Sequence, residues 1–342
     1  MSYRSACLPP QTSLGRGSPL LWAAILVAAG TAWPGALPAA DWQPGKNVEL
    51  IAGAGPGAGI DITARTLQKI MQDRKLMSPN ITVINKPGGG GAVAWNYLNQ
   101  HAGDGHFLAI TVPGILTNHI TGKSPITYTD ITPVVQLLSD YVAWTVRADS
   151  PIRSGKDLIE KLRADPASVS IAVGIGLGTP NHIASVLAAK AAGIDIRKLK
   201  FVVLNSSGES IAAALGGHVD VVASSPLSAS NQVRSGQLRP IAVSSPSRLD
   251  GLFSSVPTWK EQGINVVLAN WRGVIGSRGL TGPQVSFWEN AFASVTASEE
   301  WIASVRKNLW ENTFTNSEGS RRFLESQYQE FRSVLSDLGL AR

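Results

Sequence analysis

Three glycine-rich turns, each placed between an apolar strand pattern and a helical pattern, most strongly constrain how this chain folds. Glycine lets the backbone adopt positive φ and approach a ligand closely. The helix after each turn points unpaired N–H groups and a partial positive charge at that ligand. Tight packing would explain the glycines of a single turn equally well, but three turns in equivalent positions favour binding of a carboxylate or phosphate. The turns span residues 53–60, 85–91 and 174–180.

Strand and helix patterns alternate along the chain, which predicts an α/β fold built on mostly parallel sheets. Two blocks each begin with a strand, a glycine-rich turn and a helix, so we expect two lobes with a binding cleft between them. Asp61 is expected to be the N-cap of the first helix. Apolar residues from Leu324 to Leu338 recur in steps of three and four, which predicts a long C-terminal helix. Strands are expected at residues 48–52, 81–84, 107–112, 134–138, 142–146, 170–173, 201–204, 219–223 and 240–243.

The first 40 residues have the pattern of a secretory signal peptide. Arg4 and Arg16 precede an uncharged apolar stretch at residues 20–32, and small residues and prolines follow it. The prolines interrupt this stretch before it is long enough to span a bilayer as a helix. We therefore expect cleavage near Ala39 or Ala40 and a periplasmic mature protein.

The residue content argues against several classes of protein. The formal charge is +6 without any run of Lys or Arg, whereas nucleic-acid-binding proteins usually concentrate their positive charge. The single cysteine, Cys7, lies in the expected leader, so no thiol or disulfide chemistry is expected in the mature chain. The histidines form no metal-ligand motif, and a G-x-S-x-G hydrolase motif is missing. We therefore expect no enzyme activity, no cofactor, no metal and no nucleic-acid partner.

Some residues allow more than one interpretation. Residues 53–58 also fit G-x-G-x-x-A, a pattern of dinucleotide-binding oxidoreductases. This alternative is the weaker one, because Pro56 stiffens the turn and export removes the chain from the cytoplasmic cofactor pool. His182 follows the third turn, where a ligand contact and a capping or packing role are both open. Arg272, beside Trp271, either flanks an anion or is a stacked surface arginine.

Five motifs occur along the chain at residues 54–61, 85–91 with 104–106, 174–182, 215–220 with 235–239, and 256–258 with 261–263. Together they resemble the tripartite tricarboxylate transporter substrate-binding family, also called the Bug receptors. The resemblance covers essentially all of residues 41–342, and Asn-Trp-Arg-Gly at 270–273 resembles its tricarboxylate-type branch. The chain departs from the family in two places: its first turn has fewer prolines, and residues 204–208 lack the Pro-Tyr that many members carry.

The resemblance implies a two-lobe periplasmic binding protein of the Venus flytrap kind, type II-like, with helices flanking a mostly parallel sheet in each lobe. Residues 41–140 and 270–342 would form lobe one, and residues 141–269 lobe two. The protein would capture a small carboxylate, a citrate-like di- or tricarboxylate, and deliver it to membrane permease subunits. An acidic amino acid or an aromatic carboxylate is the alternative ligand. We expect a monomer.

The resemblance also implies which residues contact the ligand. Backbone N–H groups of the first two turns would hold one carboxylate, and loops of the second lobe would meet the rest of the solute. The expected contacts are Gly57, Ala58, Gly59, Ile60, Asp61, Gly89, Gly90, Gly91, Ala92, Thr111, Gly176, Gly178, Thr179, His182, Ser207, Ser224, Ser225 and Arg272.

Overall fold

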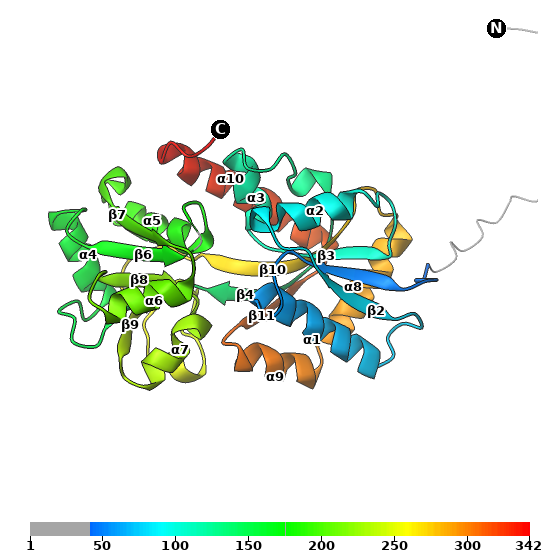
Figure 1. Ribbon diagram of the computed structural model, residues 1–342, viewed down its shortest axis with the longest axis horizontal. Helices are drawn as coiled ribbons and strands as arrows, with labels where there is room; N and C mark the ends of the chain where they lie inside the picture. The colour runs from blue at the N-terminus through cyan, green and yellow to red at the C-terminus, as the bar shows by residue number, and fades with distance from the viewer. Residues whose placement is uncertain (1–41, 175) are drawn as a thin grey trace, which may run out of the picture. The chain divides into compact units, whose positions relative to one another are not determined.

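Two β-sheets flanked by helices organise the computed structural model, which describes residues 42–174 and 176–342 (Figure 1). The expected signal peptide, including Cys7 and the cleavage positions Ala39 and Ala40, lies outside the described residues. The two-lobe α/β fold class expected from the sequence is confirmed. Both sheets are mixed rather than mostly parallel, and the path of the chain between them explains why.

The first sheet has six strands. They are β1 (Val48–Ala52), β2 (Ile81–Asn85), β3 (Phe107–Thr111), β4 (Thr132–Tyr141), β10 (Ala269–Gly276) and β11 (Glu311–Thr315), in the spatial order β11-β4-β10-β3-β1-β2. β1 pairs in parallel with β2 and β3, as the strand–turn–helix pattern predicts. β10 pairs antiparallel with both β3 and β4, and β11 pairs antiparallel with β4. The chain leaves this sheet through β4 and returns through β10, so these neighbouring strands run in opposite directions.

The second sheet has five strands. They are β5 (Ala143–Arg147), β6 (Ser170–Gly174), β7 (Lys200–Leu204), β8 (Val221–Ser224) and β9 (Leu238–Val243), in the order β7-β6-β8-β5-β9. β6 is parallel to β7 and β8, whereas β5 is antiparallel to β8 and β9. Since β5 enters this sheet directly from β4, it runs against the strands that follow it.

The passages between the sheets are short. β4 ends at Tyr141 and β5 begins at Ala143, and the chain returns to the first sheet where β10 begins at Ala269. The expected boundaries near residues 140–142 and 267–270 fall at these two passages. The assignment of residues 41–140 and 270–342 to lobe one, and of 141–269 to lobe two, stays a prediction.

Helices cover both faces of the first sheet. α1 (Gly59–Asp73), α8 (Gly282–Thr296) and α9 (Glu299–Lys307) pack on one face, where their apolar residues meet Val48 and Leu50 of β1. α2 (Ala92–Asn99), α3 (Gly114–Ile120) and α10 (Ser317–Asp337) pack on the other face against Ile51 and Trp271. Figure 1 shows α2, α3 and α10 above this sheet and α1 and α9 below it. Burial of Leu324, Phe331 and Leu335 in α10 follows the predicted spacing.

The helices of the second sheet also bury apolar residues against it, in two separate clusters. α4 (Gly155–Ala164) and α5 (Pro180–Ala191) bury apolar residues in one cluster with β6, whereas α6 (Ser207–Leu215) and α7 (Pro226–Arg234) contribute to another. Ser154 is the N-cap of α4, and its hydroxyl accepts the N–H of Asp157 at 3.2 Å. Short 3₁₀ turns are η1 (Gly89–Gly91), η2 (Tyr128–Asp130), η3 (Ile196–Lys198) and η4 (Gly251–Phe253).

The prediction that Asp61 caps α1 is wrong. Ala58 is the N-cap residue, and Asp61 is the third residue of the helix. Its carboxylate accepts the N–H of Gly57 at 2.8 Å, two residues before the helix begins. Asp61 therefore stabilises the turn that leads into α1 rather than the first N–H groups of the helix itself.

Candidate functional site

A cavity of about 470 Å³ lies between elements of the two sheets. The first sheet contributes the turn after β2, the segment around α3 and the start of β10, and the second sheet contributes the turn before α5. Four of the residues expected to contact a ligand line this cavity, namely Gly89, Gly90, Gly178 and Thr179. The other lining residues are Val112, Gly114, Thr117, Asn118, Thr121, Lys123, Leu177, Pro180 and Asn270.

The second glycine-rich turn forms the wall on the side of the first sheet. Gly89, Gly90 and Gly91 all have positive φ, between 57° and 105°, which side chains other than glycine rarely adopt. Asn118 of α3 holds this turn in place, because its Nδ2 donates to the carbonyl oxygen of Gly89 at 2.9 Å. α2 begins at Ala92, whose N–H donates to the carbonyl oxygen of Gly89, so the free N–H groups of the helix start at the next residue.

The third glycine-rich turn forms the opposite wall. Gly178 has φ of 82°, and the hydroxyl of Thr179 donates to the carbonyl oxygen of Gly176 at 2.9 Å. Nδ1 of the buried His182 accepts the N–H of Gly178 at 3.2 Å, and burial lowers the pKa of His182 to about 4. The imidazole is therefore neutral at pH 7, with its proton on Nε2. His182 acts here by positioning the turn and is not among the residues that line the cavity.

The first glycine-rich turn lies beside the second one without lining the cavity. A Cβ at Gly53 would be 3.2 Å from Cα of Gly91, so a side chain there would crowd the second turn. Nδ2 of Asn85 donates to the carbonyl oxygen of Ala54 at 2.9 Å and to the carboxylate of Asp61 at 2.8 Å. Burial raises the pKa of Asp61, but hydrogen bonds from Arg65, Gly57 and Asn85 outweigh this and keep the pKa below its ordinary value. Asp61 is thus a buried anion committed to the turn.

Arg272 lies with Asp140 and Ser225 in a buried polar cluster. Nη2 of Arg272 is 3.3 Å from Oδ2 of Asp140, and the hydroxyl of Ser225 donates to Oδ1 of Asp140 at 2.8 Å. Burial raises the pKa of Asp140 to about 6, although Arg272 and Ser225 both act to lower it. The guanidinium lies over the ring of Trp310, with Cζ 4.2 Å from the ring centroid. Arg272 is therefore buried rather than a surface residue, and the aromatic ring beneath it is not Trp271.

The remaining predicted residues are dispersed around these features. Thr111 ends β3 with a buried hydroxyl, Ser207 begins α6, and Ser224 ends β8. None of them lines the cavity, and neither do the residues from Gly57 to Asp61, Gly91, Ala92, Gly176, His182, Ser225 or Arg272. Of the predicted residues, four therefore line the cavity, Gly59 lies beside Arg272, and Ser225 contacts the neighbouring Asp140.

Several lining residues were not predicted from the sequence. Among the described residues that line the cavity, Lys123 is the only charged one, and it is exposed in the segment that follows α3. Asn118 and Asn270 contribute amide groups. Their signal in the sequence is weak, because isolated polar residues outside a motif do not reveal which surface they face.

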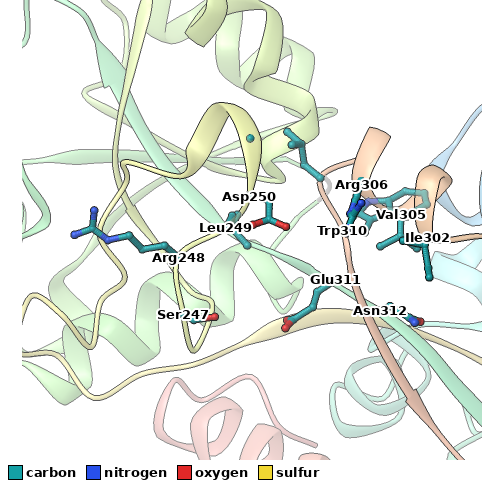
Figure 2. A pocket seen from close by; sticks show the side chains of 12 residues that line it. Ser247, Arg248, Leu249, Asp250, Ile302, Val305, Arg306, Trp310, Glu311 and Asn312 are labelled. Carbon is teal, nitrogen blue, oxygen red and sulfur yellow. The ribbon is translucent and has the colours of Figure 1, made fainter. Parts of the chain in front are cut away.

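A second cavity, of about 570 Å³, contains none of the predicted residues (Figure 2). It lies between residues 247–251 and the segment from α9 to the start of β11. Arg248 points away from Asp250 and Glu311, since its Nε pairs with Glu261 at 2.8 Å. Because its walls combine Arg306 with the carboxylates of Asp250 and Glu311, this cavity has no consistent preference for anions. We therefore take the cavity with the glycine-rich turns as the candidate site.

Two further observations apply to the described part of the chain. Within residues 42–174 and 176–342, no helix combines the length and apolar character needed to cross a membrane. In the same ranges, no group of three or more His, Cys, Asp or Glu residues is arranged to hold a metal ion.

Comparison with known proteins identifies similar sequences and folds. Residues 63–340 match the family described as tripartite tricarboxylate transporter family receptor, TctC. A protein of Cupriavidus necator, named UPF0065 protein in gbd 5'region, is 28% identical over 92% of this chain and 96% of its own length. A TctC solute-binding protein from Polaromonas has a similar fold, with a TM-score of 0.74 and 24% identity over 86% of this chain and 99% of that one. The R. palustris protein Rpa4515, solved with adipate, gives a TM-score of 0.73 and 24% identity over 87% and 99% of the two chains.

Proposed function

Because the chain belongs to the tripartite tricarboxylate transporter receptor family, we propose that it captures a small carboxylate between its two sheets and delivers it to membrane permease subunits. The ligand class is a citrate-like di- or tricarboxylate. Exchange of the solute with the permease would take place in the periplasm, after removal of residues 1–40. In this proposal, residues 41–140 with 270–342 and residues 141–269 are the two lobes that close over the solute.

The observation that carries the proposal is the composition of the cavity walls. Glycine-rich turns from both sheets line it, and a helix begins directly behind each of them. The N–H of Ala92 is bonded to Gly89 and Pro180 has none, but the following residues of each first turn present N–H groups and a partial positive charge, which suit an anion. Asn118 and Thr179 add uncharged polar groups, and Lys123 adds one positive charge. A carboxylate is thus favoured over a neutral or cationic solute.

The volume of the cavity also supports a small ligand. At about 470 Å³ the cavity is in the range of ordinary small-molecule sites. Its walls come from both sheets, so a bound solute would join the two lobes and favour the closed state. Ligands shift such an equilibrium by their difference in affinity for the open and closed states.

Isothermal titration calorimetry of the mature protein tests the proposal. The panel consists of citrate, malate, succinate and adipate, with aspartate and benzoate as the alternative anions and glucose as a neutral control. We expect at least one di- or tricarboxylate to bind, and we expect glucose to give no heat. Absence of binding by every organic acid in the panel would contradict the carboxylate proposal.

A charge variant at the cavity refines this test. Lys123→Gln removes the positive charge from the wall and should weaken carboxylate binding several-fold, because one exposed ion pair contributes about 0.2–1 kcal/mol. Lys156→Gln is the matched control, since Lys156 is exposed on α4 and does not line the cavity. Equal effects of the two substitutions would show that the cavity is not where the anion binds.

A further inference from the structure

The cavity of about 570 Å³ in Figure 2 contains two charged side chains that the folded chain leaves without an ion pair. Asp250 lies on one wall, in the segment between β9 and η4, and Arg306 lies on the other wall, on α9. Neither belongs to an ion pair anywhere in residues 42–174 and 176–342. The other two charged residues are committed, because Arg248 pairs with Glu261 and Glu311 accepts the hydroxyl of Tyr141.

The largest group of side chains along these walls is apolar. Val305 and Trp310 are buried, and the other three are half-buried. A ligand of this cavity therefore removes apolar surface from water when its own body is apolar, which favours such a body over a purely polar one. The apolar lining residues are Leu249, Ile302, Val305, Leu309 and Trp310.

We propose that this cavity is a second binding site, which takes a small zwitterion with an apolar side chain, of the class of the apolar α-amino acids. Its ammonium group pairs with Asp250, its carboxylate pairs with Arg306, and its side chain lies against the apolar wall. A simple amine leaves Arg306 without a partner, and a simple carboxylate lies beside Asp250 with no charge to match it. The site is separate from the cavity with the glycine-rich turns, so zwitterion binding does not depend on the proposed function.

Two lining residues connect this cavity to the strands that join the sheets. Glu311 accepts the hydroxyl of Tyr141, the last residue of β4, where the chain leaves the first sheet. The ring of Trp310 lies 4.2 Å from Cζ of Arg272 in β10, the strand by which the chain returns. A ligand in the cavity therefore touches side chains that hold both passages between the sheets.

The cavity also lies on the opposite side of these strands from the glycine-rich turns. In the first sheet, β11 is on one side of β4 and β10, and β3, β1 and β2 are on the other. In the second sheet, β9 is on one side of β5, and β8, β6 and β7 are on the other. The cavity walls follow β9 and precede β11, whereas the turns follow β1, β2 and β6.

A rotation about β4 and β10 has opposite effects on the two sides. When it closes the glycine-rich turns on a solute, it moves residues 247–251 away from α9. A zwitterion that occupies this widened space favours the closed state, because it binds that state more tightly than the open one. This regulatory consequence rests on the proposed function, since it concerns the closure over a carboxylate.

Isothermal titration calorimetry of the intact mature protein tests the site itself. The probes are L-leucine, L-phenylalanine and two analogues of leucine that keep its branched chain. 3-Methylbutylamine lacks the carboxylate, and 4-methylpentanoate lacks the ammonium group. We expect leucine or phenylalanine to bind, and leucine to bind about tenfold more tightly than either analogue. Absence of binding by both amino acids, or equal affinities for leucine and an analogue, would overturn the inference and leave the proposed function intact.

Charge variants locate the bound amino acid. Asp250→Asn and Arg306→Gln should each weaken its binding roughly fivefold. The matched controls are Glu160→Gln on α4 and Lys307→Gln on α9, both exposed and outside the cavity lining. Equal effects of the variants and their controls would overturn the inference. So would binding that weakens in Lys123→Gln alone, because the amino acid would then occupy the cavity with the glycine-rich turns.

The connection to the passages is tested with the carboxylate that binds best in the panel above. Saturation with the amino acid should raise its affinity about fivefold or more. Tyr141→Phe removes the hydroxyl that Glu311 accepts and should reduce this factor. Tyr97→Phe is the control, because the Tyr97 hydroxyl also donates to a glutamate, Glu49, at 2.8 Å but lies outside this cavity. A carboxylate affinity that does not change with the amino acid would overturn the regulatory role, and failure of every carboxylate to bind would contradict the proposed function instead.

Discussion

Nδ1 of His182 accepts the backbone N–H of Gly178 at 3.2 Å, and this bond joins the first turn of α5 to the glycine-rich turn that lines the candidate site. Only a neutral imidazole accepts at this atom. The ring is 2% exposed and packs edge-on against Phe201, with 4.5 Å between the ring centroids. The shape of the cavity wall therefore depends on the protonation state of a residue that does not itself line the cavity.

Acidification should destabilise the protein through His182. Burial lowers its pKa from 6.5 in the unfolded chain to about 4 in the folded state. Between pH 6.5 and pH 4, His182 is therefore protonated in the unfolded chain but neutral in the folded protein. Stability from this group is complete above pH 6.5 and falls as the pH approaches 4, by on the order of 2–3 kcal/mol. Urea unfolding at pH 7 and pH 4.5 measures this loss. His182→Gln should remove most of it, while His218→Gln, at an exposed position, should not.

Asp140 should contribute a pH dependence of the opposite sign. Burial raises its pKa from 3.8 to about 6, so the folded protein takes up a proton before the unfolded chain does. The wild-type protein should therefore gain stability relative to Asp140→Asn as the pH falls from 7 to 4.5, by roughly 2 kcal/mol. The measurement is the difference between the two unfolding free energies at each pH. A difference that is constant over this range would show that Asp140 stays ionised beside Arg272.

Asn118 is expected to contribute to both ligand binding and stability. Its Nδ2 donates to the carbonyl oxygens of Gly89 and Gly90, so Asn118→Ala frees the turn and removes a polar group from the cavity. We expect a loss of about 1–2 kcal/mol in unfolding free energy and a clear loss of carboxylate affinity. Asn96→Ala is the control, because Asn96 makes a bond of the same kind, to Ala92 at 2.9 Å, on an exposed surface. Similar affinities for both variants would contradict a role of Asn118 at the site.

The glycine-rich turns were the part of the site that the sequence could reveal. A positive φ and a close approach of two backbones both favour glycine, and Gly89, Gly90 and Gly178 could be predicted for this reason. Nine of the eleven strands that the structure describes were also predicted closely, because apolar runs between turns are a local pattern, whereas β10 and β11 were not predicted. By contrast, α3 was not predicted, since it has only seven residues and follows directly on Pro113.

The parts that depend on contacts between distant residues could not be predicted. Arg272 and Asp140 are far apart in the sequence and meet only because β10 pairs with β4. Nothing local distinguishes Arg272 in its strand from an exposed arginine, so its burial is a consequence of the sheet order. The mixed sheets have the same origin, because strand direction follows from where the chain passes between the sheets. Lys123 reaches the cavity only through the packing of α3.

A substitution at Gly91 should show how much of the second turn depends on glycine. Gly91 is buried with φ of 105°, and an added Cβ would lie 2.6 Å from the ring of the buried Trp95. Gly193 also has positive φ, 75°, but open space around its Cβ position. Gly193→Ala should therefore cost about 1–2 kcal/mol for the backbone conformation alone. Gly91→Ala adds overpacking of the core, which typically costs a further 1–3 kcal/mol or so.

Urea unfolding of the two variants separates these contributions, since both carry the same change of residue at a positive φ. The excess loss for Gly91→Ala measures the contact with Trp95, and Gly91→Ala combined with Trp95→Phe should recover part of it by shortening the ring. Carboxylate binding adds an independent measurement. Displacement of Trp95 or of the turn also moves Gly90, so affinity should fall in Gly91→Ala and stay at the wild-type value in Gly193→Ala. Equal stability losses in the two single variants would mean that the turn adapts to a side chain at residue 91. The cavity wall would then be more flexible than its contacts with Trp95 indicate.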